Sequence, residues 1–196
     1  MADFEFTPLS DEAKELTEKI LRGQLYSKLT RKLLCACLGP NNEDDTFKYR
    51  EECYKLLKEH NHIPYYPESV DDVFISRIFD KDQNWKEKKE ILLTDLDLRN
   101  KFLVSKSDIV FILITSYGPI LEFGRYAEII PTKIVVLVPE NIPSKTQSMM
   151  AVDSFQGLFP NSVIKFKDVE DMRKKIEKCL YLEARKRIWE EMHDGK

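Results

Sequence analysis

Short runs of apolar residues alternate along the chain with longer segments in which apolar residues recur every three or four positions. Such runs indicate strands, and the longer spacing indicates helices. In KLLCACL the apolar run is unbroken, which predicts a strand covered on both faces. The remaining runs are HIPYYP, DIVFILI, KIVVLVP and VIKF, and the helical spacing covers residues 10–31, 46–59, 95–106, 118–130 and 168–192.

This alternation of strands and helices predicts parallel pairing through right-handed crossovers. We therefore expect an α/β fold, a three-layer sandwich with a mostly parallel, five-stranded, Rossmann- or flavodoxin-like sheet. A chain of 196 residues is long enough for one such domain. We expect it to span residues 33–196 and to end in the long helix, with residues 1–32 as a helical extension. Residues 68–90 are expected to form a long connection that contains some helix.

Composition and charge narrow the classes of partner. Hydrophobic residues make up 42% of the chain and charged residues 33%, and the net charge is −3 with acids and bases interspersed. This distribution gives no electrostatic case for nucleic-acid binding. No apolar run approaches the roughly 18 residues of a membrane span, and the acidic start MADFEFTPLSDEAKEL lacks the features of a signal peptide. We therefore expect a cytoplasmic protein that binds neither nucleic acid nor membrane.

The four cysteines form neither a metal-binding nor a redox pattern. Cys35 and Cys37 are expected on one strand as C-x-C, and Cys53 and Cys179 are isolated. Their spacing matches neither a CxxC pair nor a zinc site. We expect buried free thiols, and we expect neither a metal nor a cofactor.

Ligands of open parallel sheets bind beyond the carboxyl ends of the strands. Three unusual turns fall there: LGPNNEDD after the first predicted strand, TSYGP after the third and PENIPSKTQSMM after the fourth. We expect these turns to form the walls of a pocket. LGPNNEDD has a single glycine and matches neither G-x-G-x-x-G nor G-x-x-x-x-G-K-[ST], so a Rossmann dinucleotide site or a Walker site is not expected. Its acids are expected to cap the following helix.

The stretch TSYGPILEFG places a carboxylate just after the third predicted strand. Pro119 suits the first position of a helix, and Ser116 or Thr115 can cap that helix. Gly118 permits close approach of the backbone to a ligand. Glu122 then falls in the first helical turn, where the helix dipole favours its ionised form by about 0.3–1 kcal/mol.

The neighbours of Glu122 leave two interpretations open. They are apolar, which indicates that the carboxylate is at least partly buried. Gly124 costs about 1 kcal/mol relative to alanine inside a helix, and such a glycine usually has a packing or ligand reason. In the alternative interpretation, Glu122 is an ordinary first-turn acid that pairs with Arg125 three residues on.

Four segments together resemble one enzyme family. CACLGP, FKYREECYKLLKEHNHIPYYP, SDIVFILI and GPILEFGRYA occur in the order and at the spacing of the nucleoside 2-deoxyribosyltransferase-like family, which includes the deoxynucleoside 5′-monophosphate N-glycosidases. The resemblance covers roughly residues 33–150. It implies that Glu122 attacks the anomeric carbon of the deoxyribose and displaces the base. A glycosyl-enzyme ester remains, which water or a second base resolves.

The resemblance also implies further site residues. Asp97 is the aspartate nearest to the position from which the family protonates or orients the departing base, whereas a gap-free alignment places Asn100 there. Gly39 and Pro40 match the glycine-containing loop that follows the first strand of the family. We therefore expect both to contact the substrate.

Two further matches concern a phosphate and a second subunit. Ser116, Tyr117 and Gly118 look like the S-x-G of the monophosphate hydrolases, whereas the transferases carry an aspartate six residues before the nucleophile. A neutral hydroxyl beside a helix N-terminus suits a phosphate, so a 5′-phosphorylated substrate is favoured, with Tyr117 stacking on the base. Ser148 and Met149 resemble a stretch that the hydrolases insert into the neighbouring subunit's site, which implies a homodimer or higher homo-oligomer. The alternative is a plain loop.

These observations lead to three hypotheses. The first is cleavage or transfer at the N-glycosidic bond of a small-molecule substrate, a (deoxy)nucleoside or nucleoside 5′-monophosphate. The second is a non-catalytic sensor of the same fold that binds a nucleotide or NAD derivative. The third is an interaction protein that uses its C-terminal helix. The enzyme hypothesis requires Glu122, Ser116 and the turn at Gly39 and Pro40 to face one pocket.

Overall fold

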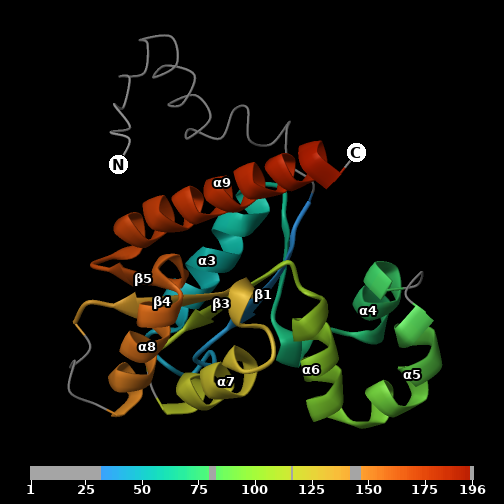
Figure 1. Cartoon of the computed structure of the whole chain (residues 1–196). Coiled ribbons are helices and arrows are strands. Elements are labelled where there is room, and N and C mark those ends of the chain that lie inside the picture. Colours follow the sequence, from blue (N-terminus) through green and yellow to red (C-terminus); the bar gives the residue numbers. More distant parts are fainter. Residues whose placement is uncertain (1–31, 80–82, 116, 142–146, 195–196) are drawn as a thin grey trace. The chain divides into compact units, whose positions relative to one another are not determined.

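The apolar runs form a parallel sheet in the structure, a computed structural model that describes residues 32–79, 83–115, 117–141 and 147–194. The strand order is β2-β1-β3-β4-β5, and every neighbouring pair is parallel (Figure 1). The predicted five-stranded sheet is confirmed. β2 lies on one side of β1, and the chain then returns past β1 to form β3 on its other side. The strand order therefore reverses between β1 and β3. The strands are β1 (Leu34–Leu38), β2 (Ile63–Tyr65), β3 (Ile109–Leu113), β4 (Ile134–Pro139) and β5 (Val163–Phe166).

Helices cover both faces of the sheet, which confirms the predicted three layers (Figure 1). On one face α3 (Phe47–Glu59) buries Cys53, Leu56 and Leu57. On the other face α4 to α8 share an apolar core with strand residues such as Ala36 and Val110. These helices are α4 (Asp72–Phe79), α5 (Gln83–Thr94), α6 (Leu96–Lys106), α7 (Tyr117–Ala127) and α8 (Gln147–Leu158); η1 (Pro67–Ser69), η2 (Pro131–Lys133), η3 (Pro160–Ser162) and α9 (Val169–Asp194) complete the described elements.

The three central strands are buried along their whole length. Every residue of β1, β3 and β4 is buried, as expected of strands covered on both faces. Successive side chains alternate between the faces, so Cys35 and Cys37 belong to the side opposite Ala36. None of the four cysteines forms a disulfide, and Cys35, Cys37 and Cys53 are buried as predicted, whereas Cys179 is only partly buried.

The segment after β4 differs from the sequence prediction. PENIPSKTQSMM was expected to be a turn that walls the pocket, but α8 begins within it at Gln147, and none of its described residues lines the pocket. Parallel neighbours such as β4 and β5 need a long crossover connection, and α8 supplies it. Met149, Val152 and Phe155 recur at helical spacing and enter the apolar core. The surrounding polar residues concealed this short pattern.

The described chain falls into two parts. Lys32–Ile176 form one compact unit, and the residues from Glu177 onward lie outside it. The helix expected over residues 10–31 lies outside the described residues, as does the extension over residues 1–32 apart from Lys32. Within the described ranges, the structure contains no helix with the length and apolar content needed to cross a membrane.

A buried hydroxyl pair beside the sheet gives a first testable prediction. Tyr65 and Ser107 are 3% and 0% exposed, and their hydroxyl oxygens lie 2.7 Å apart. Ser107 also donates to the Leu103 carbonyl, so Tyr65 donates to Ser107. Ser107→Ala is expected to lower the free energy of unfolding by about 1–3 kcal/mol, because the Tyr65 hydroxyl loses its partner. Urea denaturation measures the loss.

The double variant with Ser107→Ala and Tyr65→Phe is the control. It removes both hydroxyls, and replacing both partners of a buried hydrogen bond by apolar groups is nearly neutral. The double variant should therefore recover most of the stability that Ser107→Ala loses. Equal losses in the two variants would show that the orphaned hydroxyl is not the cause.

Candidate functional site

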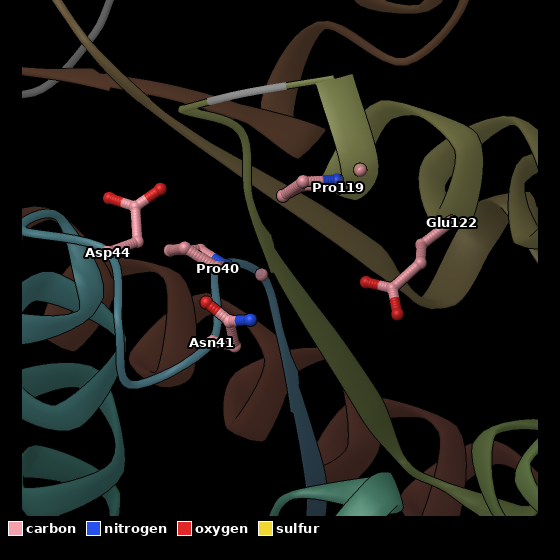
Figure 2. A pocket seen from close by; sticks show the side chains of 7 residues that line it. Pro40, Asn41, Asp44, Pro119 and Glu122 are labelled. Carbon is pink, nitrogen blue, oxygen red and sulfur yellow. The ribbon is translucent and has the colours of Figure 1, made fainter.

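A pocket of about 270 Å³ lies beyond the carboxyl ends of β1 and β3 (Figure 2). Because the strand order reverses between these two strands, the pocket occupies the position at which open α/β sheets bind their ligands. The turns after β1 and β3 supply its walls, and it brings together four residues predicted for the site with three others. The lining residues are Gly39, Pro40, Asn41, Asp44, Gly118, Pro119 and Glu122.

Gly39 lets the turn after β1 pass close to the end of β3. Its φ of 145° lies in the left-handed region that side-chain-bearing residues rarely adopt. A Cβ at this position would lie 3.0 Å from the Leu113 Cβ and 3.1 Å from the Leu113 carbonyl oxygen. A glycine is therefore required both by the backbone conformation and by the space available.

This requirement predicts a difference between two Gly→Ala variants. Gly39→Ala is expected to lower the free energy of unfolding by about 1–3 kcal/mol, the usual range for a backbone held in a sparsely populated conformation. Gly124→Ala is the matched control, because a Cβ there meets nothing within 4 Å. The control should gain up to about 1 kcal/mol in helical propensity. Urea denaturation compares the two, and a similar loss in both would contradict the assigned role of Gly39.

Arg50 of α3 binds the backbone of the same turn, a role that was not predicted from the sequence. Its side chain is 3% exposed. Nε and Nη2 donate to the Cys37 carbonyl at 3.0 and 2.7 Å, and Nη1 donates to the carbonyls of Pro40 at 3.0 Å and Gly39 at 3.4 Å. A signal existed in the sequence, because Arg50 shares the helical spacing of the buried Cys53.

A hydroxyl pair connects the two turns that wall the pocket. The Thr46 hydroxyl, at the start of α3, lies 2.8 Å from the Thr115 hydroxyl just after β3. The Thr46 hydroxyl and its N–H also hydrogen-bond Asp44. These hydrogen bonds lower the pKa of Asp44, which stays ionised at neutral pH. The acids of this turn were expected to cap the following helix, but the N-cap of α3 is Thr46, which has no side-chain cap hydrogen bond. Asp44 instead accepts from Thr46 and lines the pocket.

Helix α7 begins two residues earlier than predicted, at Tyr117 instead of Pro119. The first four N–H groups of a helix have no intrahelical partner, so proline is tolerated at the third position. Gly118, which precedes the proline, tolerates helical geometry better than other residues would. Glu122 consequently lies in the second turn rather than the first. The helix dipole acts mainly within the first turn and contributes less than expected.

The Glu122 carboxyl group is directed into the pocket (Figure 2) and is partly buried. Its Oε2 atom is buried and has no hydrogen-bond partner. Burial raises the pKa of Glu122 from 4.5 to about 7, and the nearby Glu68 also raises it. The charges of Arg50 and Arg125 and a hydrogen bond to the Gly39 amide lower it, but burial outweighs them. Protonated and ionised forms therefore coexist at neutral pH.

Arg125 binds Asp97 of α6, with Nη1 2.5 Å from Oδ1. The alternative in which Glu122 is tied to Arg125 is therefore not the arrangement found. Asp97 also pairs with Lys101 at 2.8 Å. Hydrogen bonding to Lys101 and the charge of Arg125 hold the pKa of Asp97 below its usual value. Asp97 is half exposed and is not among the residues that line the pocket, so its position does not suit protonation of a leaving base.

The other predicted residues fall in several places. Asn100 lies on α6, partly buried, and its Oδ1 atom is buried without a hydrogen-bond partner. Gly124 is exposed and has open space around it, so no packing reason accounts for it. Ser116 lies outside the described residues, as do the side chains of Tyr117 and Ser148.

Met149 was expected to reach a neighbouring subunit. It lies on α8 and is 4% exposed within the apolar core of its own chain. The plain loop considered as the alternative is also not found, because α8 is helical from Gln147 onward. The homo-oligomer implied by the resemblance stays a prediction.

Comparisons with known proteins add no further identification. No family model, no curated protein and no solved structure matches the chain. The resemblance to the nucleoside 2-deoxyribosyltransferase-like family therefore rests on the residues of this chain and on the pocket that they form.

Proposed function

We propose that this protein cleaves or transfers at the N-glycosidic bond of a (deoxy)nucleoside or nucleoside 5′-monophosphate, with Glu122 as the nucleophile. The observation that carries this proposal is the position of Glu122. Its carboxyl group is directed into a pocket at the reversal of strand order, and its buried Oε2 atom has no hydrogen-bond partner among the described residues. A carboxyl with an unsatisfied buried oxygen and a perturbed pKa in a cleft is characteristic of functional sites.

The proposed reaction proceeds in two steps. In the first, an oxygen of the ionised Glu122 forms a bond to the anomeric carbon, and the C–N bond breaks with its electron pair leaving on the base, which takes up a proton. In the second, water or the N–H nitrogen of another base attacks the anomeric carbon. The bond from that carbon to the Glu122 oxygen breaks with its electron pair returning to the carboxylate, and the attacking group gives up its proton to solvent. A pKa of about 7 leaves about half of the Glu122 carboxyl groups ionised at pH 7.

The walls of the pocket offer polar atoms to a sugar, and the start of α7 lies among them. Asn41 and Asp44 line the pocket across from Glu122 and offer polar atoms to sugar hydroxyls (Figure 2). Gly118 and Pro119, at the start of α7, line the same pocket. Helix N-termini hold anions through their free N–H groups, which supports a 5′-phosphate on the substrate.

A second candidate is binding of a nucleotide or NAD derivative without turnover. The position of Asp97 favours it, because this predicted proton donor is paired with Lys101 and Arg125 outside the pocket. A base that is not protonated leaves slowly, so a site without a donor would retain its ligand. The two candidates share the pocket and differ in whether the base is released.

One screen separates the two candidates. The full chain is incubated with deoxynucleosides, ribonucleosides, their 5′-monophosphates and NAD, and free base is measured by chromatography beside Glu122→Gln. Release that depends on Glu122 supports the enzyme, and the nucleoside and monophosphate pairs report whether a phosphate is recognised. Binding by calorimetry with no released base supports the second candidate. Neither release nor binding would contradict both.

A further inference from the structure

Arg50 connects three elements around the pocket. In addition to its bonds to the turn after β1, its Nη2 atom lies 2.5 Å from Oε1 of Glu68 in η1. Its guanidinium carbon lies 4.5 Å from the centre of the Tyr66 ring. Glu68 is half exposed, whereas Arg50 is almost fully buried. A buried planar guanidinium held by so many partners is rigid, and lysine cannot reproduce its fork of donors.

The segment that Arg50 binds is also the segment that meets Glu122. The Arg50 guanidinium donates hydrogen bonds to the carbonyls of Cys37, Gly39 and Pro40. Gly39, Pro40 and Glu122 line the same pocket, and the Gly39 amide lowers the pKa of the Glu122 carboxyl. Glycine adopts the positive φ found at Gly39 without strain, so outside hydrogen bonds are what fix the position of this flexible backbone. Arg50 supplies such bonds on the carbonyl side of the turn.

We propose that Arg50 is the positioning residue for Glu122: it fixes the turn at Gly39 and Pro40 that walls the pocket of Glu122, and its buried positive charge acts on the carboxyl group. The catalytic consequence rests on the proposed function, since it matters for turnover only if Glu122 is the nucleophile. The structural consequence does not, because the ionisation of Glu122 can be measured without any substrate.

Charged groups on several elements act on Glu122. Arg50 of α3 and Arg125 of α7 favour the ionised carboxylate, and Glu68 of η1 opposes it. Tyr126 of α7 is a neighbour whose own pKa is raised by burial and by Glu122. Asp44 lines the pocket from the turn after β1. Among these charges, that of Arg50 has the largest lowering effect on the Glu122 pKa, and Glu68 has the largest raising effect.

The proposal predicts shifts of opposite sign in two variants. In Arg50→Met the carboxylate loses the positive charge that lowers its pKa most and the turn at Gly39 loses its support, so the pKa of Glu122 should rise by about one unit or more. At pH 7 this lowers the ionised fraction about fivefold, and kcat/KM should fall at least that much while the acid limb of its pH profile moves to higher pH. In Glu68→Gln the pKa should fall and the acid limb should move to lower pH.

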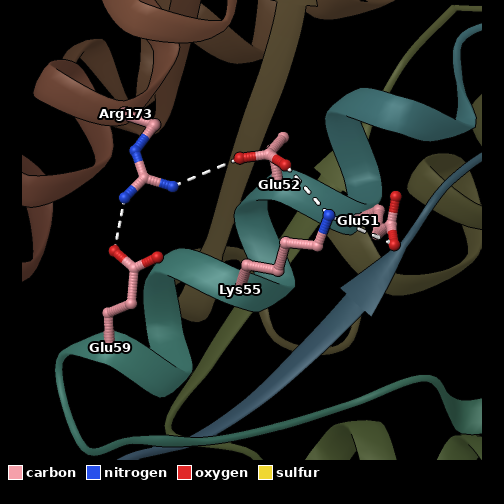
Figure 3. A network of polar contacts seen from close by, with 5 residues as sticks. All are labelled: Glu51, Glu52, Lys55, Glu59 and Arg173. Atoms are coloured by element: carbon pink, nitrogen blue, oxygen red, sulfur yellow. Dashed lines mark hydrogen bonds and ion pairs between the residues drawn. The ribbon is translucent and has the colours of Figure 1, made fainter.

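Two further variants separate charge from structure. Arg50→Lys keeps the charge but not the fork of donors, so the pKa of Glu122 should move less than in Arg50→Met while turnover still falls. Arg173→Met is the matched control. Arg173 binds Glu52 and Glu59 of α3, the helix that carries Arg50, in a separate network of charges (Figure 3). Its removal should leave the pKa of Glu122 and the pH profile unchanged.

The measurement is a ¹³C NMR titration of the full chain with labelled glutamate carboxyls, with Glu122→Gln to assign the Glu122 signal, beside pH profiles of kcat/KM. A Glu122 pKa in Arg50→Met equal to that in Arg173→Met would overturn the proposal. If Arg50→Met does not fold, Arg50→Lys and Glu68→Gln decide, and an unmoved pKa in both overturns it. Opposite pKa shifts without base release in any variant would support the positioning role and contradict the proposed function. Base release that requires Glu122 but does not change in the Arg50 variants would support the proposed function and contradict the positioning role.

Discussion

Glu122→Gln is expected to lower base release by at least about a thousandfold, the scale seen when a nucleophile is removed. Glutamine has nearly the shape of glutamate but no negative charge, so it cannot form the ester with the anomeric carbon. The fold should persist, because Oε2 of Glu122 makes no hydrogen bond that the substitution would break. Initial rates by chromatography, at a pH where wild-type turnover is maximal, measure the effect.

Glu128→Gln provides the control for lost charge. Glu128 is exposed just after α7 and does not line the pocket. The Glu128→Gln variant should turn over substrate at the wild-type rate. Its circular dichroism spectrum should match those of the wild type and of Glu122→Gln. Wild-type turnover by Glu122→Gln would remove Glu122 from the mechanism.

The same substitution is expected to stabilise the fold at alkaline pH. Burial raises the pKa of Glu122 from 4.5 to about 7 in the folded chain, so the folded state binds more protons than the unfolded state between these values. Stability is unaffected below about pH 4.5 and falls as pH rises through 7. The full penalty is about 3 kcal/mol. Glu122→Gln has no carboxyl group to ionise, so at pH 8 its free energy of unfolding should exceed that of the wild type by up to this penalty.

Urea denaturation of both proteins at several pH values between 4.5 and 8 measures this difference. The difference in free energy of unfolding between the two proteins is compared, because other groups titrate in the same pH range and change stability in the opposite direction. Burial lowers the pKa of His62 to about 4, which adds stability as pH rises, and this effect cancels between the two proteins. Glu128→Gln should show no such trend. A difference between wild type and Glu122→Gln that does not grow with pH would mean that the carboxyl is well solvated.

The two results for Glu122→Gln reinforce one another. A variant that is more stable at pH 8 and yet inactive cannot have lost its activity by unfolding. The stability that the wild type gives up is then the consequence of keeping a carboxyl group with an unsatisfied buried oxygen in a pocket, which is the usual relation between stability and activity at functional sites.

The sheet was predictable because its strands are short unbroken apolar runs and its longest helices have regular apolar spacing. Helix α8 was not, because only Met149, Val152 and Phe155 mark its buried side. The start of α7 was misplaced because proline is tolerated at any of the first helical positions, and the sequence does not say which one. Local patterns thus identify elements well and their ends poorly.

The pocket was predictable in part. Gly39 and Glu122 follow strands whose carboxyl ends meet at one edge of the sheet, which is a consequence of parallel topology. The role of Arg50 was hidden, because its partners are backbone carbonyls, which no side-chain pattern reveals. The pairing of Asp97 with Arg125 was hidden as well, because it joins two helices that only the tertiary structure brings together.

The strand order also determines the sequence of events as the chain is synthesised. β1 can pair with β2 early, but its other edge waits for β3, and the Leu34 amide donates to Asp108, a residue 74 positions further along the chain. Until the ribosome has released the third strand, the apolar run of β1 presents an open edge to other chains. Such long-range pairing slows folding and leaves nascent chains prone to aggregation. The reversal of strand order that creates the pocket therefore makes the first strand of the sheet dependent on a segment from the second half of the chain.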